Sequence, residues 1–161
     1  MRRFNFRHAE LKVDADEPDG YRAPYAPIRP VIGAEKLAGT VVLLHKGESL
    51  CPYHFELAEE EWLIVLEGTP SVRTPDGDEV MEAGDIVCFA RGPEGAHKIS
   101  NFAAEPARVI MISERAETAG TVYEDSDKLG IFGPGTRLMF RRADAVDYWE
   151  GEGPPEGHGP A

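Results

Sequence analysis

The feature that most constrains the fold is a run of short apolar and β-branched segments separated by turn-forming residues. Segments of strand length lie at 40–45, 61–67, 71–74, 79–82, 85–89, 97–102 and 107–113. Their starts recur about every ten residues, and Pro75-Asp-Gly-Asp78 between the third and fourth predicts a tight hairpin. This regularity favours an antiparallel sandwich or barrel over alternating βα units. The sequence therefore predicts an all-β fold.

The flanking segments have a different composition. Prolines punctuate 23–30, and proline removes a backbone donor and restricts the residue before it, so no helix is expected there. Beyond Glu114 the strand signal weakens, with short strands expected at 121–124 and 137–141 and a loop at 126–135. Residues 151–161 are mostly Gly and Pro, which excludes His158 as a ligand candidate. The expected organisation is an extended arm with edge strands (1–38), a barrel (39–115), a strand-and-loop extension of the same domain (116–150) and a flexible tail (151–161).

Composition bounds the function classes. A chain of 161 residues with 42% hydrophobic and 29% charged residues is expected to form one globular domain. A net charge of −12 argues against nucleic acid and against anionic membrane surfaces, since both are bound through Lys and Arg. No apolar run approaches the about 18 residues of a membrane helix, and no signal-peptide segment is recognisable, so a cytoplasmic location is expected. Cys51 and Cys88 are expected to be buried reduced thiols.

Two histidines and two glutamates on or beside the predicted strands could share one site. His54 and Glu56 point the same way if their segment is extended, because side chains alternate along a strand. Glu61 begins an otherwise apolar strand face, and His97 begins another strand. Burying a carboxylate is costly unless a partner or a cation offsets its charge, and a bound metal would do so. Solvated or hydrogen-bonded side chains are the alternative, since the acidic run at 59–61 is also typical of an exposed edge.

These residues carry a resemblance to the cupin superfamily. The first cupin motif is glycine, five residues, His-x-His, three or four residues, Glu, six residues and Gly. Here it is matched by Gly47, His54, Glu61 and Gly68. The second is glycine, five residues, Pro-x-Gly, two residues, His, three residues and Asn, matched here by Gly84, Gly92, His97 and Asn101. The resemblance implies a single double-stranded β-helix, a jelly-roll-like barrel with an extended N-terminal arm and an irregular C-terminal segment.

The departures from the motifs concern mainly Glu56. Glu56 stands where the second His is expected, Ala90 replaces the Pro, and the spacings before His54 and His97 are longer. The resemblance implies a divalent metal ion (Mn, Fe, Ni or Zn) bound by His54, Glu61 and His97. Glu56 is then either a fourth ligand or a carboxylate that acts on substrate. Replacing a neutral His by a carboxylate makes the site harder and lowers its net charge. The competing interpretation is that Glu56 has abolished metal binding.

Two classes of function follow. One is an enzyme that acts on a small, anionic metabolite by isomerase, lyase or dioxygenase chemistry, with sugar-phosphate isomerisation as one possibility. Its catalytic candidates are Glu56 or Glu61 as general base and Arg91 as an anion clamp, with Lys98 and Arg73 as further basic residues. The other is a non-catalytic small-molecule-binding module whose metal site Glu56 has altered or removed. In either case we expect a homodimer, because small cupins commonly pair through edge strands.

Overall fold

Antiparallel strands form nearly all of the regular secondary structure in the computed structural model, which describes residues 1–153. All the predicted strands between 40 and 113 form, with ends that differ by a few residues. In chain order the elements are β1 Tyr25–Pro27, α1 Arg29–Ile32, β2 Leu37–Leu44, β3 His54–Glu56, β4 Glu61–Glu67, β5 Ser71–Thr74, β6 Gly77–Val80, β7 Ile86–Phe89, η1 Pro93–Gly95, β8 Lys98–Ser100, β9 Ala107–Glu114, β10 Ala119–Tyr123, η2 Glu124–Ser126, β11 Lys128–Gly133, β12 Thr136–Arg141 and η3 Arg142–Asp144.

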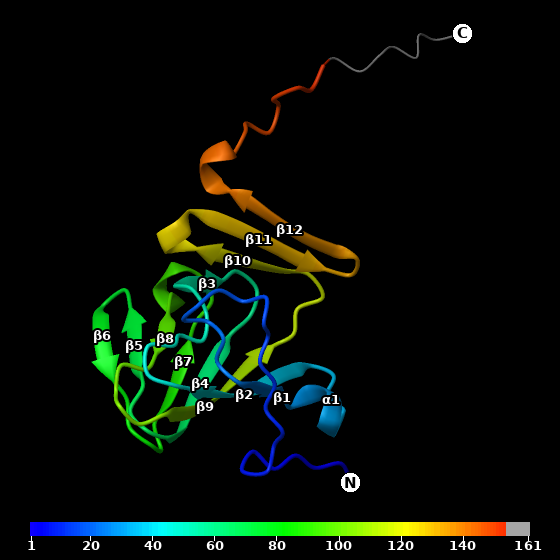
Figure 1. Ribbon diagram of the computed structural model, residues 1–161. Coiled ribbons are helices and arrows are strands. Elements are labelled where there is room, and N and C mark those ends of the chain that lie inside the picture. The colour runs from blue at the N-terminus through cyan, green and yellow to red at the C-terminus, as the bar shows by residue number, and fades with distance from the viewer. Residues whose placement is uncertain (154–161) are drawn as a thin grey trace.

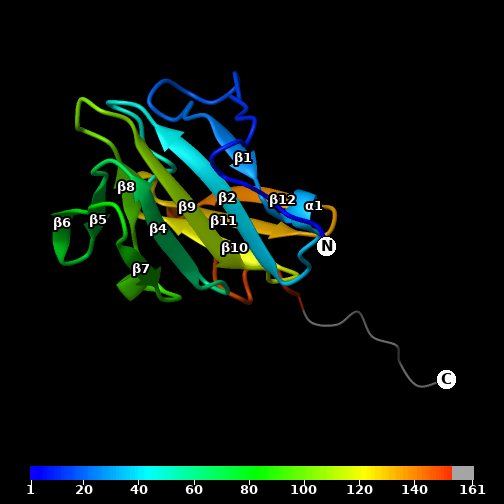
Figure 2. The ribbon, with the colours of Figure 1, turned by 90° about the horizontal axis from the view of Figure 1, so that it is seen from below.

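Three sheets arrange these strands into a jelly-roll-like barrel, as predicted. The first sheet has the order β1-β2-β9-β4-β7, the second β6-β5-β8, and the third β12-β11-β10-β3. The C-terminal strands β10–β12 lie across one end of the barrel, with β3 beside them (Figure 1). Seen from below, β2, β9 and β4 run side by side along one wall (Figure 2). The strand β3 therefore connects the C-terminal sheet to the rest of the barrel.

The barrel interior follows from alternation along its strands. In β9 the buried positions are Ala107, Val109 and Met111, and in β4 they are Leu63 and Val65. These side chains belong to one apolar cluster. Because alternate residues of a strand point to opposite faces, the same strands present their other residues outward. Glu61 lies on the inward face of β4, two positions before Leu63 and four before Val65.

The C-terminal region is more regular than the sequence predicted. The strands expected near 121–124 and 137–141 are present as β10 and β12. The expected loop at 126–135 is wrong, because β11 pairs with β10 and with β12 along its length. Gly130, which weakened the strand pattern, is a packing residue, since a Cβ there would lie 2.7 Å from the Phe132 ring. The tail expected at 151–161 falls mostly outside the described residues.

The N-terminal arm also differs in part from the expectation. It contains one edge strand, β1, which pairs with β2. The proline-rich stretch nevertheless runs into a single helical turn, α1, with Pro30 in its first turn, where the missing N–H costs no helical hydrogen bond. Cys88, expected to be buried, is exposed, because it lies on β7 at the edge of its sheet. No helix within residues 1–153 is long and apolar enough to cross a membrane.

Candidate metal centre

The two motif histidines face each other across an isolated antiparallel bridge. His54 opens β3, and His97 immediately precedes β8. The amide of His54 donates to the carbonyl of His97 at 3.1 Å, and the amide of His97 donates back at 2.8 Å. Their ring centroids lie 4.6 Å apart. Backbone pairing thus brings together two imidazoles that are far apart in the chain.

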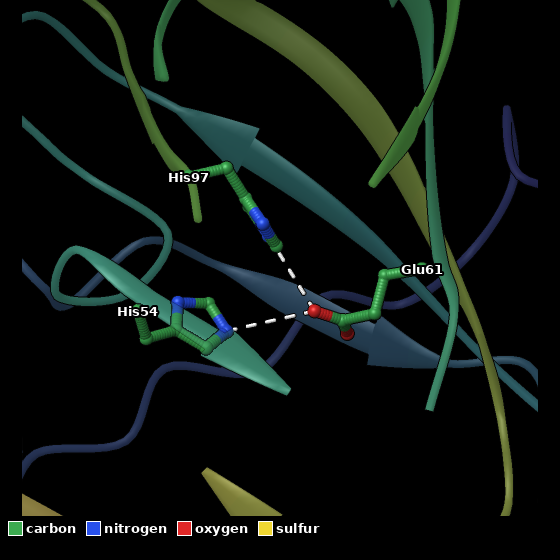
Figure 3. Close-up of side chains that lie close together, drawn as sticks. All are labelled: His54, Glu61 and His97. Atoms are coloured by element: carbon green, nitrogen blue, oxygen red, sulfur yellow. Dashed lines mark ion pairs between the residues drawn. The ribbon is translucent and has the colours of Figure 1, made fainter. Parts of the chain in front are cut away.

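Glu61 completes a cluster of three. Its Oε2 lies 3.5 Å from Nε2 of His54 and 3.4 Å from Nε2 of His97 (Figure 3). One ligand atom from each of the three residues lies within 4.8 Å of the other two. His97 is 1% exposed at its side chain and Glu61 16%. The inward face of β4 therefore carries a carboxylate to two buried imidazoles.

The hydrogen bonds of the imidazoles leave their Nε2 atoms free to act as ligands. Nδ1 of His54 lies 2.9 Å from the carbonyl of Pro52, and Nδ1 of His97 lies 2.9 Å from that of Gly95. A carbonyl only accepts, so each Nδ1 carries the proton and donates it. Among the described residues, the buried Nε2 of His97 and Oε2 of Glu61 have no hydrogen-bond partner. Buried acceptors that converge in this way fit a bound cation, and backbone-anchored histidines are usual at metal sites.

The two imidazoles of the metal-free cluster differ in protonation. Burial, aided by the charge of His54, lowers the pKa of His97 to about 4, so this imidazole is neutral near pH 7. Burial also lowers the pKa of His54, but contacts with Cys51 and Glu61 outweigh it and raise the value to about 11. Without a metal, His54 supplies the positive charge that Glu61 needs. A divalent ion would take over that role and displace the proton.

Glu56 lies beside the cluster but is not part of the three-residue group. Its Oε1 is 3.7 Å from Nε2 of His54, as expected from their shared strand face. Both carboxylate oxygens lie 2.8 Å from the hydroxyl of Thr121 on β10. Burial and the charge of Glu61, opposed by the Thr121 hydrogen bond, raise the pKa of Glu56 to about 7. Tyr123, two residues further along β10, stacks on His54 with centroids 5.9 Å apart.

A cavity of about 380 Å³ opens against the cluster. Besides His54, Glu61 and His97, its walls include Tyr21, Tyr25, Val42, Leu50 and Met111. Among residues 1–153, no lysine or arginine lines it. A second, more open cavity shares Ala38 and Ser113 with the first. It is lined by Glu56, Thr121 and Tyr123 and by side chains of both charges, including Arg115 and Arg137.

The basic candidates lie away from the cluster. Arg91 is exposed and bound to Glu114 at 2.6 Å, and it lines neither of these two cavities. Arg73 is bound to Asp125 at 2.7 Å. The ammonium of Lys98 lies 5.5 Å from the ring centroid of Tyr21, which is itself a wall of the first cavity. The structure thus brings together His54, Glu56, Glu61 and His97, and it does not bring Arg91 to them.

Sequence reasoning missed three neighbours of the site. Thr121 and Tyr123 were expected only as part of a short strand, and Phe89 only as part of another. Phe89 stacks on His97 with centroids 3.7 Å apart. The pairing of β10 with β3, which places Thr121 opposite Glu56, has no signal in the local sequence. A buried Thr on a strand would be the only available hint, and it is not specific.

The comparisons with known proteins agree with this architecture. Residues 40–113 match the family described as Cupin domain. The match assigns residues 40–113, the barrel part of the chain, to the cupin domain family. A cupin-superfamily sugar phosphate isomerase from Silicibacter pomeroyi has 18% identity and a TM-score of 0.79, over 89% of this chain and 94% of that one. A candidate sugar phosphate isomerase from Acidithiobacillus ferrooxidans has 23% identity and a TM-score of 0.78, over 87% and 88%.

A third structural neighbour covers less of this chain. A Cupin 2 conserved barrel domain protein from Salinispora arenicola has 19% identity and a TM-score of 0.56, over 72% of this chain and 90% of that one. At these identities the likeness shows the fold alone. No curated protein matches the sequence. The residue-level argument for function therefore rests on the site itself.

Proposed function

We propose that this cupin is a metal-dependent enzyme that binds one divalent ion through His54, Glu61 and His97 and acts on a small metabolite. One observation carries the proposal. The buried Nε2 of His97 and Oε2 of Glu61 face each other at 3.4 Å without a hydrogen-bond partner among the described residues. Leaving such groups unpaired is costly, and a cation removes the cost. Three protein ligands with open positions are typical of catalytic rather than structural metal sites.

The chemistry follows from what surrounds the three ligands. A bound divalent ion supplies Lewis acidity toward a substrate oxygen. Glu56 would then take or give a proton on the substrate, because its carboxylate lies beside the cluster and lines the adjoining cavity. The residues Tyr21, Tyr25 and Leu50 would enclose the substrate and exclude water. Isomerisation and lyase chemistry need these elements, and dioxygenation would need a redox-active ion such as Fe.

The substrate proposed is a small, oxygen-rich and anionic metabolite. The first cavity offers about 380 Å³, and within residues 1–153 its lining carries no lysine or arginine, so an anionic group would depend on the metal there. The adjoining cavity offers Arg115 and Arg137. Sugar phosphates are the first compounds to test, because the structural neighbours from Silicibacter pomeroyi and Acidithiobacillus ferrooxidans are described as a sugar phosphate isomerase and a candidate sugar phosphate isomerase. The anion clamp proposed for Arg91 would require this side chain to leave Glu114.

Metal content tests the proposal directly. The wild-type protein and a His54→Ala/His97→Ala variant would be purified in parallel and analysed by inductively coupled plasma mass spectrometry. We expect close to one Mn, Fe, Ni or Zn per chain in the wild type and almost none in the variant. Equal, near-zero metal in both would overturn the proposal.

A non-catalytic binding module is the second candidate, and Glu56 in place of the motif His is the observation that favours it. A panel of sugar phosphates and related metabolites distinguishes the two functions. Each compound would be incubated with the metal-loaded wild type and with the double variant, and mass spectrometry would follow its concentration. Consumption by the wild type alone supports the enzyme. Retention of a compound without consumption supports the binding module.

A further inference from the structure

The hydroxyl of Thr121 holds the carboxylate of Glu56. Thr121 lies opposite Glu56 in the β10–β3 register and is 4% exposed. Its Oγ1 lies 2.8 Å from each of the two carboxylate oxygens. A hydroxyl carries one proton, so both oxygens share a single donor, which lies centrally in front of the carboxylate. This contact turns the polar end of Glu56 toward β10.

Without that contact Glu56 could reach the metal ligands. Its Oε1 lies 3.7 Å from Nε2 of His54, and the two residues project from the same face of β3. A glutamate has three rotatable side-chain bonds, so a modest rotation would bring one oxygen among the ligand atoms. Glu56 nevertheless stays outside the group formed by His54, Glu61 and His97. Among the described residues, Thr121 is the side chain that hydrogen-bonds the Glu56 carboxylate and holds it in this position.

We infer that Thr121 is a positioning residue that keeps Glu56 out of the metal's ligand set and free to serve the substrate. The inference rests on the proposed function, because it presupposes a metal at the three-residue cluster. It also gives β10 a role in the site, although β10 lies beyond the family match at residues 40–113. Hydrogen-bond partners of this kind commonly decide which carboxylates bind a metal and how strongly.

Two substitutions of Thr121 distinguish the effect of its hydroxyl from the effect of its packing. Thr121→Val keeps the shape and removes the donor, whereas Thr121→Ser keeps the donor and is the matched control. Mn²⁺ affinity would be measured by electron paramagnetic resonance titration, and the Co²⁺-loaded proteins would be compared by visible absorption. In Thr121→Val we expect Glu56 to join the ligands, about tenfold tighter Mn²⁺ binding and an altered Co²⁺ spectrum. Thr121→Ser should match the wild type.

The double variant Thr121→Val/Glu56→Gln assigns the effect to Glu56. We expect it to lose the gain in Mn²⁺ affinity and to restore a wild-type Co²⁺ spectrum. Unchanged or weaker Mn²⁺ binding in a folded Thr121→Val protein, with a wild-type Co²⁺ spectrum, would overturn the inference and leave the proposed function standing. A wild-type protein that binds neither ion would overturn the proposed function and this inference with it.

Glu56→Gln alone provides a second test if Thr121→Val does not fold. If Glu56 is outside the ligand set, Glu56→Gln should leave the Co²⁺ spectrum like that of the wild type, although loss of a partly buried charge weakens Mn²⁺ binding. A Co²⁺ spectrum that changes in Glu56→Gln would identify Glu56 as a ligand and overturn the inference. Circular dichroism and thermal unfolding of each variant would establish that it is folded.

Discussion

The ring of Phe89 lies flat against the imidazole of His97, with centroids 3.7 Å apart and planes tilted by 9°. Together with the hydrogen bond from Nδ1 of His97 to Gly95, this stacking fixes the orientation of the ring. A ligand that is held in place before the metal arrives loses little freedom on binding it. The position of Nε2 therefore depends on a side chain that contacts no metal.

We expect Phe89→Leu to weaken metal binding by about tenfold, because it keeps the site apolar but removes the flat support of His97. Isothermal titration with Mn²⁺ would measure the change. Phe102→Leu is the matched control, since Phe102 is 69% exposed and should leave the affinity unchanged. Equal affinities in the two variants would contradict the positioning role of Phe89.

The motif glycines Gly47 and Gly68 should respond differently to substitution. Both have positive φ, +86° and +81°, which strains any residue with a Cβ by about 1–2 kcal/mol. A Cβ at Gly68 would also lie 2.6 Å from the carbonyl oxygen of Pro106, whereas one at Gly47 meets nothing within 4 Å. Gly68→Ala should therefore lower the free energy of unfolding by more than about 2 kcal/mol and Gly47→Ala by about 1. Urea unfolding would measure the free energy of unfolding of both variants. Equal losses would show that the close contact at Gly68 adds nothing to the cost of the substitution.

Asn101 should contribute to stability rather than to chemistry. It is fully buried, its amide donates to the carbonyls of Leu44 and Glu105, and its Oδ1 accepts from Ala103. Asn101→Ala leaves these backbone groups unpaired and should cost about 2–4 kcal/mol of unfolding free energy. Asn5→Ala is the control, because Asn5 is the only other asparagine in the sequence and it is exposed. A loss of metal in Asn101→Ala without a loss of stability would contradict this assignment.

The ion pair of Arg91 and Glu114 should make a pH-dependent contribution to stability. The guanidinium, together with the amide of Glu60, lowers the pKa of Glu114 below its ordinary value. A depressed carboxyl pKa stabilises the fold above the unfolded pKa, about 4.3, and this contribution disappears as the pH falls through the folded pKa. Arg91→Gln should therefore reduce the urea midpoint slightly at pH 7 and by less at pH 3. Arg141→Gln, which removes no ion pair formed within residues 1–153, is the control. A deficit of equal size at both pH values would contradict the assignment.

The homodimer expected from the sequence stays a prediction. The chain mass is 17.7 kDa, so light scattering coupled to size exclusion should give about twice that value, near 35 kDa. A mass near that of one chain at micromolar concentration would contradict it.

The barrel and the three-residue cluster could be predicted because each rests on a local pattern. Alternation placed Glu61 on the inward face of its strand, and the motif spacing selected His54 and His97. The sequence could not distinguish Glu56 as a metal ligand from Glu56 as a carboxylate that acts on substrate. Its hydrogen-bond partner Thr121 is 65 residues away in the chain. Pairing between distant strands leaves no trace in either strand alone. The loop expected at 126–135 was wrong for a related reason, since Gly130 lies within the paired strand β11, against the ring of Phe132, and not in a turn.

The three-residue strand β3 has consequences for any attempt to move this site into another protein. One of its edges pairs with β10, and His54 meets His97 on the other. Residues 40–113 alone would leave the first edge without its partner and Glu56 without Thr121. The smallest transplantable unit is therefore larger than the recognised domain, and it ends no earlier than Tyr123.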